Sequence, residues 1–167
     1  MKYRPVVDLL PDGIGTLTGV AREVEKVVCY VLHEDHLLVF THDTLPMEVT
    51  GVQVPAGSIK TSETPQQAAV RELFEETGLR GAVVRKVGVQ RYDLRPTRDE
   101  IAIRHFYQLR LPSANVESRW SAQESDVPNG EEPIPWTCWW LPLENVHVLS
   151  AGFGALIGDA LTIGEGR

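Results

Sequence analysis

Three glutamates near the middle of the chain, Glu72, Glu75 and Glu76, have a spacing that could support chemistry. Each residue of a helix advances by about 100°, so the three carboxylates would share an arc of about 100°. Like charges on adjacent helical turns repel one another by roughly a few tenths of a kcal/mol per pair. A hard divalent cation relieves this repulsion, because Mg²⁺ takes oxygen ligands and often bridges carboxylates to substrate phosphates. The spacing therefore favours metal-assisted phosphate chemistry, and a solvated acidic helix face is the alternative.

A helix that begins at Pro65 and ends before Gly78 is expected to carry these glutamates. Thr64 suits the N-cap position, and Gln67 completes a capping box with it. Gly78 is suited to a left-handed stop at the C-terminal end. The arc that is expected to pack on a sheet carries four other residues, namely Val70, Leu73, Phe74 and Thr77.

The residues around the glutamates fit a longer pattern, G-x5-E-x7-R-E-U-x-E-E-x-G-U, in which U is a bulky aliphatic residue. All nine specified positions are matched between Gly57 and Leu79. A chance match has odds on the order of one in a billion per starting position. The pattern is the Nudix box, so the chain resembles the Nudix hydrolases. The likeness is tight over the box and looser elsewhere, through the strand order and a tryptophan-rich strand before Leu141-Pro142-Leu143.

The resemblance implies a fold, a metal ion and a set of residue roles. The implied fold is α+β, an α/β/α sandwich with a mixed central sheet. The implied cofactor is Mg²⁺, with Mn²⁺ as the alternative. The implied metal ligands are Gly57, through its carbonyl, and Glu72, Glu75 and Glu76. Arg71 and Glu63 join these glutamates as catalytic candidates, because a guanidinium can hold carboxylates ionised. An ion pair that only braces the loop is an equal alternative for Arg71 and Glu63.

The rest of the chain is expected to complete one domain over residues 1–167. Residues 1–22 are interpreted as an N-terminal extension or a strand, and 57–79 as the box. Apolar runs at 27–32 and 37–40 indicate a hairpin. Further strands are expected at 51–55, 83–92, 101–111 and 136–141, a short turn or helix at 143–146, and a C-terminal helix at 151–161. The acidic, proline-containing segment 112–135 is longer than a structural loop needs to be.

Several residues outside the box are candidates for contacts with a substrate. A local basic cluster in an otherwise acidic chain suits a diphosphate, and its members are Arg91, Arg95, Arg98 and Arg104. A solvated hairpin edge is the alternative reading of this cluster. The acidic loop 112–135 could supply a water-activating base, for which the candidates are Glu124, Glu131 and Glu132. The sequence leaves open whether the base lies there or in the box. His105 and the tryptophans at 136, 139 and 140 favour core positions over ligand contacts.

The composition limits the kinds of binding partner that are expected for this chain. Sixteen basic residues against 23 acidic ones give a formal charge of −7, which disfavours binding to duplex nucleic acid. The two cysteines, Cys29 and Cys138, form no CxxC pair and are expected to be buried thiols. A signal peptide and an apolar run of about 20 residues are both lacking, so the expected location is the cytoplasm, with no membrane partner. A small phosphorylated, nucleotide-like substrate is expected, and a homodimer is left open.

These observations together predict hydrolysis of a pyrophosphate bond in a nucleoside diphosphate that is linked to another group. The lead-in Val54-Pro55-Ala56-Gly57 resembles that of ADP-ribose-type enzymes, which favours ADP-ribose or a nucleotide sugar as substrate. The rival hypothesis is a non-catalytic Nudix-fold module that senses a nucleotide. Such modules commonly carry a damaged box, whereas the box of this chain is complete.

Overall fold

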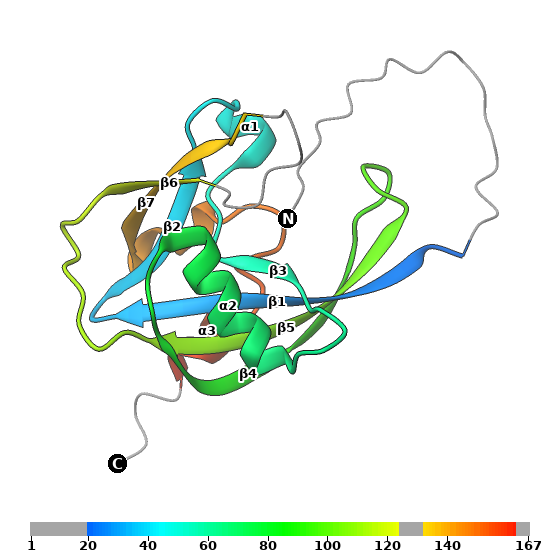
Figure 1. The fold of residues 1–167 in the computed structure, drawn as a ribbon, viewed down its shortest axis with the longest axis horizontal. Coiled ribbons are helices and arrows are strands. Elements are labelled where there is room, and N and C mark those ends of the chain that lie inside the picture. Colours follow the sequence, from blue (N-terminus) through cyan, green and yellow to red (C-terminus); the bar gives the residue numbers. More distant parts are fainter. Residues whose placement is uncertain (1–19, 124–131, 163–167) are drawn as a thin grey trace.

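The computed structural model describes residues 20–123 and 132–162 (Figure 1). The strands are β1 (Arg22–His33), β2 (His36–His42), β3 (Ala56–Ser58), β4 (Ala82–Asp93), β5 (Glu100–Arg110), β6 (Trp120–Gln123) and β7 (Pro135–Pro142). The helices are α1 (Met47–Thr50), α2 (Pro65–Thr77), the 3₁₀ helix η1 (Leu143–Val148) and α3 (Ile157–Leu161). Among these residues, no helix combines the length and the hydropathy that crossing a bilayer requires.

The strands form one mixed sheet in the order β4-β5-β1-β2-β7-β6, and β3 pairs with β1 beside this path. The expected hairpin joins β1 to β2 through a tight turn in which Glu34 has a positive φ of 49°. The central pair, β1 and β5, runs parallel, with Lys26 opposite Arg104. On its other side Lys26 is opposite Ser58 of the antiparallel strand β3. Chain segments that are far apart in sequence therefore meet at the middle of β1.

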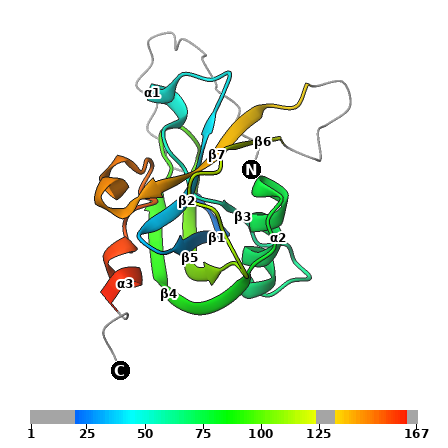
Figure 2. The same ribbon diagram turned by 90° about the vertical axis from the view of Figure 1, so that its left-hand side faces the viewer.

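Helical elements cover both faces of the sheet (Figure 2). On one face Val27, Cys29 and Val31 of β1 form an apolar cluster with Ala68, Ala69 and Leu73 of α2. On the other face Val28 and Tyr30 pack with Phe153 and the C-terminal segment. This arrangement agrees with the mixed sheet between helices that was expected from the sequence. Both faces of β1 are apolar because both are covered.

Two expected elements differ from the structure at their ends. The segment 51–55 forms only isolated bridges, at Val52 and Gln53, and the regular strand β3 begins after Pro55. Over the expected helix at 151–161 the chain first makes turns, and α3 occupies only its last five residues. The physical reason is that Ala151 and Gly152 have positive φ values of 52° and 74°, which a right-handed helix cannot include.

The segment 112–135 is not one continuous loop, which corrects the expectation from its composition. Residues 120–123 form β6, which pairs antiparallel with β7 and places Trp120 opposite Cys138. Two of the three candidate bases in this segment, Glu124 and Glu131, lie outside the described residues, as do residues 1–19 at the N-terminus. Glu132 is described and is exposed shortly before β7 begins.

Candidate active site

Helix α2 begins and ends as the sequence predicts. Thr64 accepts a hydrogen bond from the backbone amide of Gln67, and the Gln67 side chain accepts one from the Thr64 amide. Gly78 ends the helix in the left-handed conformation, with φ 75°. Because these local contacts fix the first and last turns of α2, the register of the glutamates along the helix is also fixed.

The face that α2 turns toward the sheet differs from the expected one. Val70 and Phe74 were expected to pack on the sheet, but they are 38% and 44% exposed. The buried residues of α2 include Ala68, Ala69 and Glu72, the last only 5% exposed. Small alanines allow the helix to lie close to β1, where the Cys29 thiol contacts the Ala69 carbonyl oxygen at 3.4 Å. Two of the three glutamates therefore point toward the protein, and only Glu75 lies on the exposed side.

Strand β3 receives the glutamates of α2. A Cβ atom on Gly57 would overlap the carboxyl group of Glu72, so only glycine leaves room for this side chain. One residue earlier, the backbone amide of Ala56 donates a hydrogen bond to Oε2 of Glu76 at 2.8 Å. The first glycine of the box is thus in direct contact with a glutamate of its helix.

Arg71 links four parts of this site through its guanidinium group. Its Nε and Nη2 atoms donate to both carboxylate oxygens of Glu63, at 2.9 and 2.5 Å. Its Nη1 atom donates to Glu72 at 2.6 Å and to Glu75 at 2.9 Å. Nη2 also donates to the backbone carbonyl of Ser58 at 3.0 Å. The hydrogen bonds from Arg71 lower the pKa of Glu63 to about 2. This geometry supports the bracing interpretation of Arg71 and Glu63.

The two buried carboxylates carry more negative charge than their surroundings favour. Burial, together with the nearby charge of Glu72, raises the pKa of Glu76 to about 8. Burial also raises the pKa of Glu72. Although Glu76 keeps some exposed surface, its carboxyl group lies among protein atoms. Either a proton or a cation is therefore needed to offset this cluster.

The donor atoms of this cluster fit a divalent cation in chemical type. Carboxylate and carbonyl oxygens are the ligands that Mg²⁺ prefers. Within 20–123 and 132–162, no three His, Cys, Asp or Glu side chains already stand around one point. Instead, Nη1 of Arg71 is hydrogen-bonded to both Glu72 and Glu75. A cation at this cluster would thus share its carboxylates with Arg71.

The raised pKa of Glu76 predicts how the stability of the metal-free protein depends on pH. Its pKa is about 8 in the folded chain, against an ordinary value of 4.5. Between these two pH values the folded state holds a proton that the unfolded state has released. The stabilising contribution of this proton is full below about pH 4.5 and is lost as the pH rises through about 8. We expect Glu76→Gln to melt at a higher temperature than the wild type in chelator, by a margin that grows between pH 5 and 8.5.

Thermal melts of both proteins at a series of pH values measure this margin. Glu117→Gln is the matched control, because Glu117 is exposed and its backbone amide donates to Asn115 within its own loop. This control should follow the wild type at every pH. A margin that stayed constant or shrank with rising pH would show that Glu76 is not a protonated group in the folded chain.

The four arginines of the predicted basic cluster do not all lie together. Two are exposed and paired with acids, Arg91 with Glu23 at 3.4 Å and Arg95 with Asp93 at 2.5 Å. Arg91 is opposite Ile103 in the sheet, so it lies on the other face from the neighbouring Arg104. Arg98 belongs to the turn between β4 and β5, where its amide donates to the Leu94 carbonyl. Strand alternation thus prevents Arg91 and Arg104 from serving one ligand.

Arg104 is the buried member of this set, only 2% exposed. Its Nη1 atom donates to the backbone carbonyl of Ala151 at 2.5 Å. Its guanidinium carbon lies 4.0 Å from the centre of the Tyr92 ring and 4.9 Å from that of Phe153. These neutral partners hold the guanidinium group in place without neutralising its charge.

The tryptophan-rich strands anchor the C-terminal end of α2. The indole nitrogen of Trp136 donates to the Glu76 carbonyl at 2.7 Å, and that of Trp120 donates to the Thr77 carbonyl at 2.8 Å. Trp139 and Trp140 belong to different apolar clusters, because adjacent residues of a strand point to opposite faces of the sheet. Cys29 and Cys138 are both buried free thiols, as expected. The tryptophans at 136 and 140 are buried, in agreement with their expected core role.

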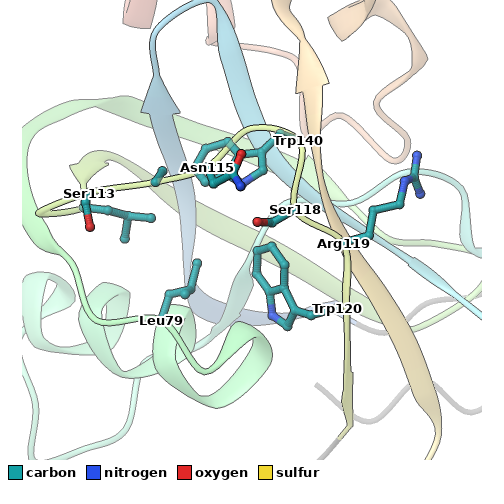
Figure 3. A pocket seen from close by; sticks show the side chains of 9 residues that line it. Leu79, Ser113, Asn115, Ser118, Arg119, Trp120 and Trp140 are labelled. Atoms are coloured by element: carbon teal, nitrogen blue, oxygen red, sulfur yellow. The ribbon is translucent and has the colours of Figure 1, made fainter.

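A cavity of about 550 Å³ lies beyond this end of α2 (Figure 3). Trp120, Trp140 and Leu79 line its apolar part, and Asn115 and Ser118 belong to its polar part. None of the three box glutamates lines it. The cavity is therefore separate from the carboxylate cluster.

Lys26 is a buried charge near the box that the sequence interpretation missed. It is 6% exposed, and its ammonium nitrogen lies 3.5 Å from the Ser58 hydroxyl. Glu72 of the box and Arg98 are among the charges that act on it. The available signal was a lysine directly before the apolar run 27–32, at a position where a strand covered on both faces would carry an apolar residue.

Comparisons with known proteins agree with this geometry. The family model of the NUDIX domain matches residues 22–155. An RNA pyrophosphohydrolase of Francisella philomiragia is 32% identical over an aligned length of 108 residues, and the alignment covers 58% of this chain and 68% of that protein. An ADP-ribose pyrophosphatase of Bacillus subtilis is 33% identical over 89 residues, 49% of this chain and 48% of that protein. The alignments therefore span about half to two thirds of these curated relatives.

A solved structure supports the same fold. A NUDIX hydrolase from Nitrosomonas europaea superposes with a TM-score of 0.61 at 15% identity, covering 83% of this chain and 88% of that one. At this identity the likeness concerns the fold alone. It confirms the sandwich with a mixed sheet that the sequence predicts.

Proposed function

Because this chain belongs to the Nudix hydrolase family, we propose that it hydrolyses a pyrophosphate bond in a nucleoside diphosphate that is linked to another group. In this reaction water attacks one phosphorus atom, the bridging P–O bond breaks, and two phosphate-bearing products leave. The observation that carries the proposal is the convergence of Glu72 and Glu76 of α2 on Gly57 and Ala56 of β3. This convergence supports a metal-binding role for Glu72, Glu76 and Gly57, which are three of the four ligands that the box pattern implies.

A divalent cation, Mg²⁺ or Mn²⁺, is proposed to be held by Glu72, Glu75, Glu76 and the carbonyl group of Gly57. When bound, such an ion supplies charge neutralisation for the phosphate oxygens and lowers the pKa of bound water. The protein's own part is to hold these oxygens in place. Arg71 orients Glu72 and Glu75 by donating a hydrogen bond to each, and Glu63 fixes Arg71 through two hydrogen bonds.

The proposed substrate is ADP-ribose or a nucleotide sugar. Support comes from the sequence that leads into the box and from the curated ADP-ribose pyrophosphatase that the chain resembles. A second candidate is the 5′ end of RNA that carries a pyrophosphate, because the first curated relative is named an RNA pyrophosphohydrolase. The formal charge of −7 is compatible with the end of a single strand, where contacts with a long phosphate backbone are not needed.

A panel of substrates with Mg²⁺ tests this proposal and separates its two candidates. The panel contains ADP-ribose, a nucleotide sugar and a 5′-triphosphorylated oligoribonucleotide, and the products are separated by chromatography. We expect cleavage of at least one of these at the pyrophosphate bond, abolished by chelator. Binding of a panel member with no cleavage above that of Glu76→Gln would instead favour the rival sensing module.

The general base is proposed to lie either in the box or in the segment around β6. Each of Glu124, Glu131 and Glu132 is changed singly to Gln. If one of them activates water, its variant should lose at least about a hundredfold in kcat while Mg²⁺ affinity stays unchanged. Steady-state kinetics with a Mg²⁺ titration measure both quantities. Normal kcat in all three variants would assign the base to a glutamate of the box. Replacing such a glutamate should weaken metal binding as well as lower kcat.

A further inference from the structure

Lys26 and Arg104 are adjacent buried cations on one face of the sheet. They are paired across β1 and β5, and Ser58 of β3 is opposite Lys26 on the other side. The neighbouring residues on the same face, Val28 and Phe106, belong to the apolar core. The exposed fractions of Lys26 and Arg104 are only 6% and 2%. Two positive charges thus interrupt an apolar layer on the face opposite α2.

The described residues form no ion pair with these two charges, and the carboxylates of Glu100 and Glu72 act on Lys26 only from a distance. The one hydrogen bond from Lys26 reaches the neutral Ser58 hydroxyl, at the long distance of 3.5 Å. Arg104 donates to the Ala151 carbonyl and otherwise faces two aromatic rings. Within 20–123 and 132–162, neither side chain forms an ion pair with a carboxylate. Burying a cation without an anionic partner costs several kcal/mol, and a like charge beside it adds to this cost.

An anion between the two side chains would remove this cost. We propose that Lys26 and Arg104 form an anion subsite that binds a phosphate group of the substrate's diphosphate, an inference that rests on the proposed function. Ser58 directly follows Gly57, whose Cα lies against the Glu72 carboxyl group. The subsite therefore lies across β3 from the carboxylate cluster. This places one phosphate near the metal ligands and the other near Lys26 and Arg104.

The alternative role for Lys26 is to balance the negative charge of Glu72. A purely structural lysine of this kind would stabilise the fold and would contribute nothing to the affinity for a diphosphate. A binding lysine has the opposite signature, because a buried charge that waits for its ligand destabilises the free protein. The two roles therefore predict opposite effects of Lys26→Met on the melting temperature.

Isothermal titration of the full chain with imidodiphosphate, a pyrophosphate analogue with a P–N–P bridge, tests the subsite in Mg²⁺ buffer. Lys26→Met removes the charge and keeps a side chain of similar length, whereas Lys26→Arg restores a cation. Lys86→Met is the matched control, because Lys86 is exposed on β4 of the same sheet. Melting temperatures of all variants are measured in parallel without ligand.

We expect Lys26→Met to weaken imidodiphosphate binding at least about tenfold, the usual effect of losing a hydrogen bond to a charged group. Its melting temperature should equal or exceed that of the wild type. Lys26→Arg should bind more tightly than Lys26→Met, and Lys86→Met should match the wild type. Equal affinity in Lys26→Met and wild type, or no binding by the wild type, would overturn the inference.

A lowered melting temperature with unchanged affinity would assign Lys26 to structural balance of Glu72 and would also overturn the inference. The titration needs no turnover, so it is independent of the proposed hydrolysis. If the wild type cleaved no substrate of the panel but lost imidodiphosphate affinity through Lys26→Met, the subsite would stand and the proposed hydrolysis would fail.

Discussion

Replacing Glu76 by Gln is expected to lower Mg²⁺-dependent turnover at least about a hundredfold while the fold stays intact. The change keeps the shape of the side chain and removes one charge from the carboxylate cluster. The amide oxygen of the new side chain can still accept the hydrogen bond from the Ala56 amide, which the Glu76 carboxylate accepts at 2.8 Å. Because the amide is a far weaker ligand for a hard cation, the loss should concern metal-assisted catalysis and not structure.

Steady-state kinetics on the best substrate of the panel measure this effect, and circular dichroism checks the fold. Glu117→Gln removes an exposed carboxylate elsewhere in the chain and should leave kcat unchanged. Near-normal turnover of Glu76→Gln at saturating Mg²⁺ would show that the cluster is not the catalytic centre.

Replacing Gly57 by Ala is expected to lower the activity while leaving the stability of the fold nearly unchanged. The new methyl group would occupy the space of the Glu72 carboxyl group. That group is the far end of a flexible side chain, so it can turn away without a large change in the free energy of unfolding. A displaced ligand at a reacting centre costs about a hundredfold in rate. We therefore expect kcat to fall about a hundredfold, with a melting temperature close to that of the wild type.

Gly78→Ala is the matched control, and the opposite result is expected. Gly78 has φ 75° and no atom within 4 Å of the position that a Cβ would take. The alanine would be strained in the left-handed conformation by about 1–2 kcal/mol, with no change at the carboxylates. The melting temperature should fall and kcat should not. If Gly57→Ala lost stability and activity together, as an unfolded site would, the close contact with Glu72 would not explain its effect.

Local signals in the sequence predicted the element that carries the chemistry. Thr64, Gln67 and Gly78 set the ends of α2 through contacts within three or four residues, which a sequence displays directly. The tight turn between β1 and β2 is local in the same way. The box pattern added the match between Gly57 and the glutamates, and the structure places Gly57 in contact with Glu72.

The orientation of α2 could not be predicted from the helix alone. Apolar Val70 and Phe74 suggested one buried face, whereas the helix buries its alanines and Glu72. Close approach to β1 favours small side chains at the contact, and Arg80 partly covers Phe74 from 4.4 Å. Burial of a carboxylate is unfavourable by itself, so a rule based on hydropathy would always turn Glu72 outward.

The pairing of Lys26 with Arg104 also could not be predicted from the sequence. It depends on the parallel register of β1 and β5, which are separated in sequence by residues 34–99. The arginines were grouped by their nearness in sequence, but strand alternation puts Arg91 and Arg104 on opposite faces. Burial and register, which appear only in the fold, select Arg104 from the four and add Lys26.

Binding of Mn²⁺, followed by electron paramagnetic resonance, tests most directly whether the carboxylate cluster of α2 holds a divalent cation. The wild type should bind Mn²⁺, and added Mg²⁺ should displace it. Glu72→Gln should weaken this binding at least about tenfold, because it removes a charged oxygen ligand, whereas Glu117→Gln should bind as the wild type does. Equal Mn²⁺ affinity in all three proteins would contradict the assignment of Glu72 as a metal ligand of this cluster.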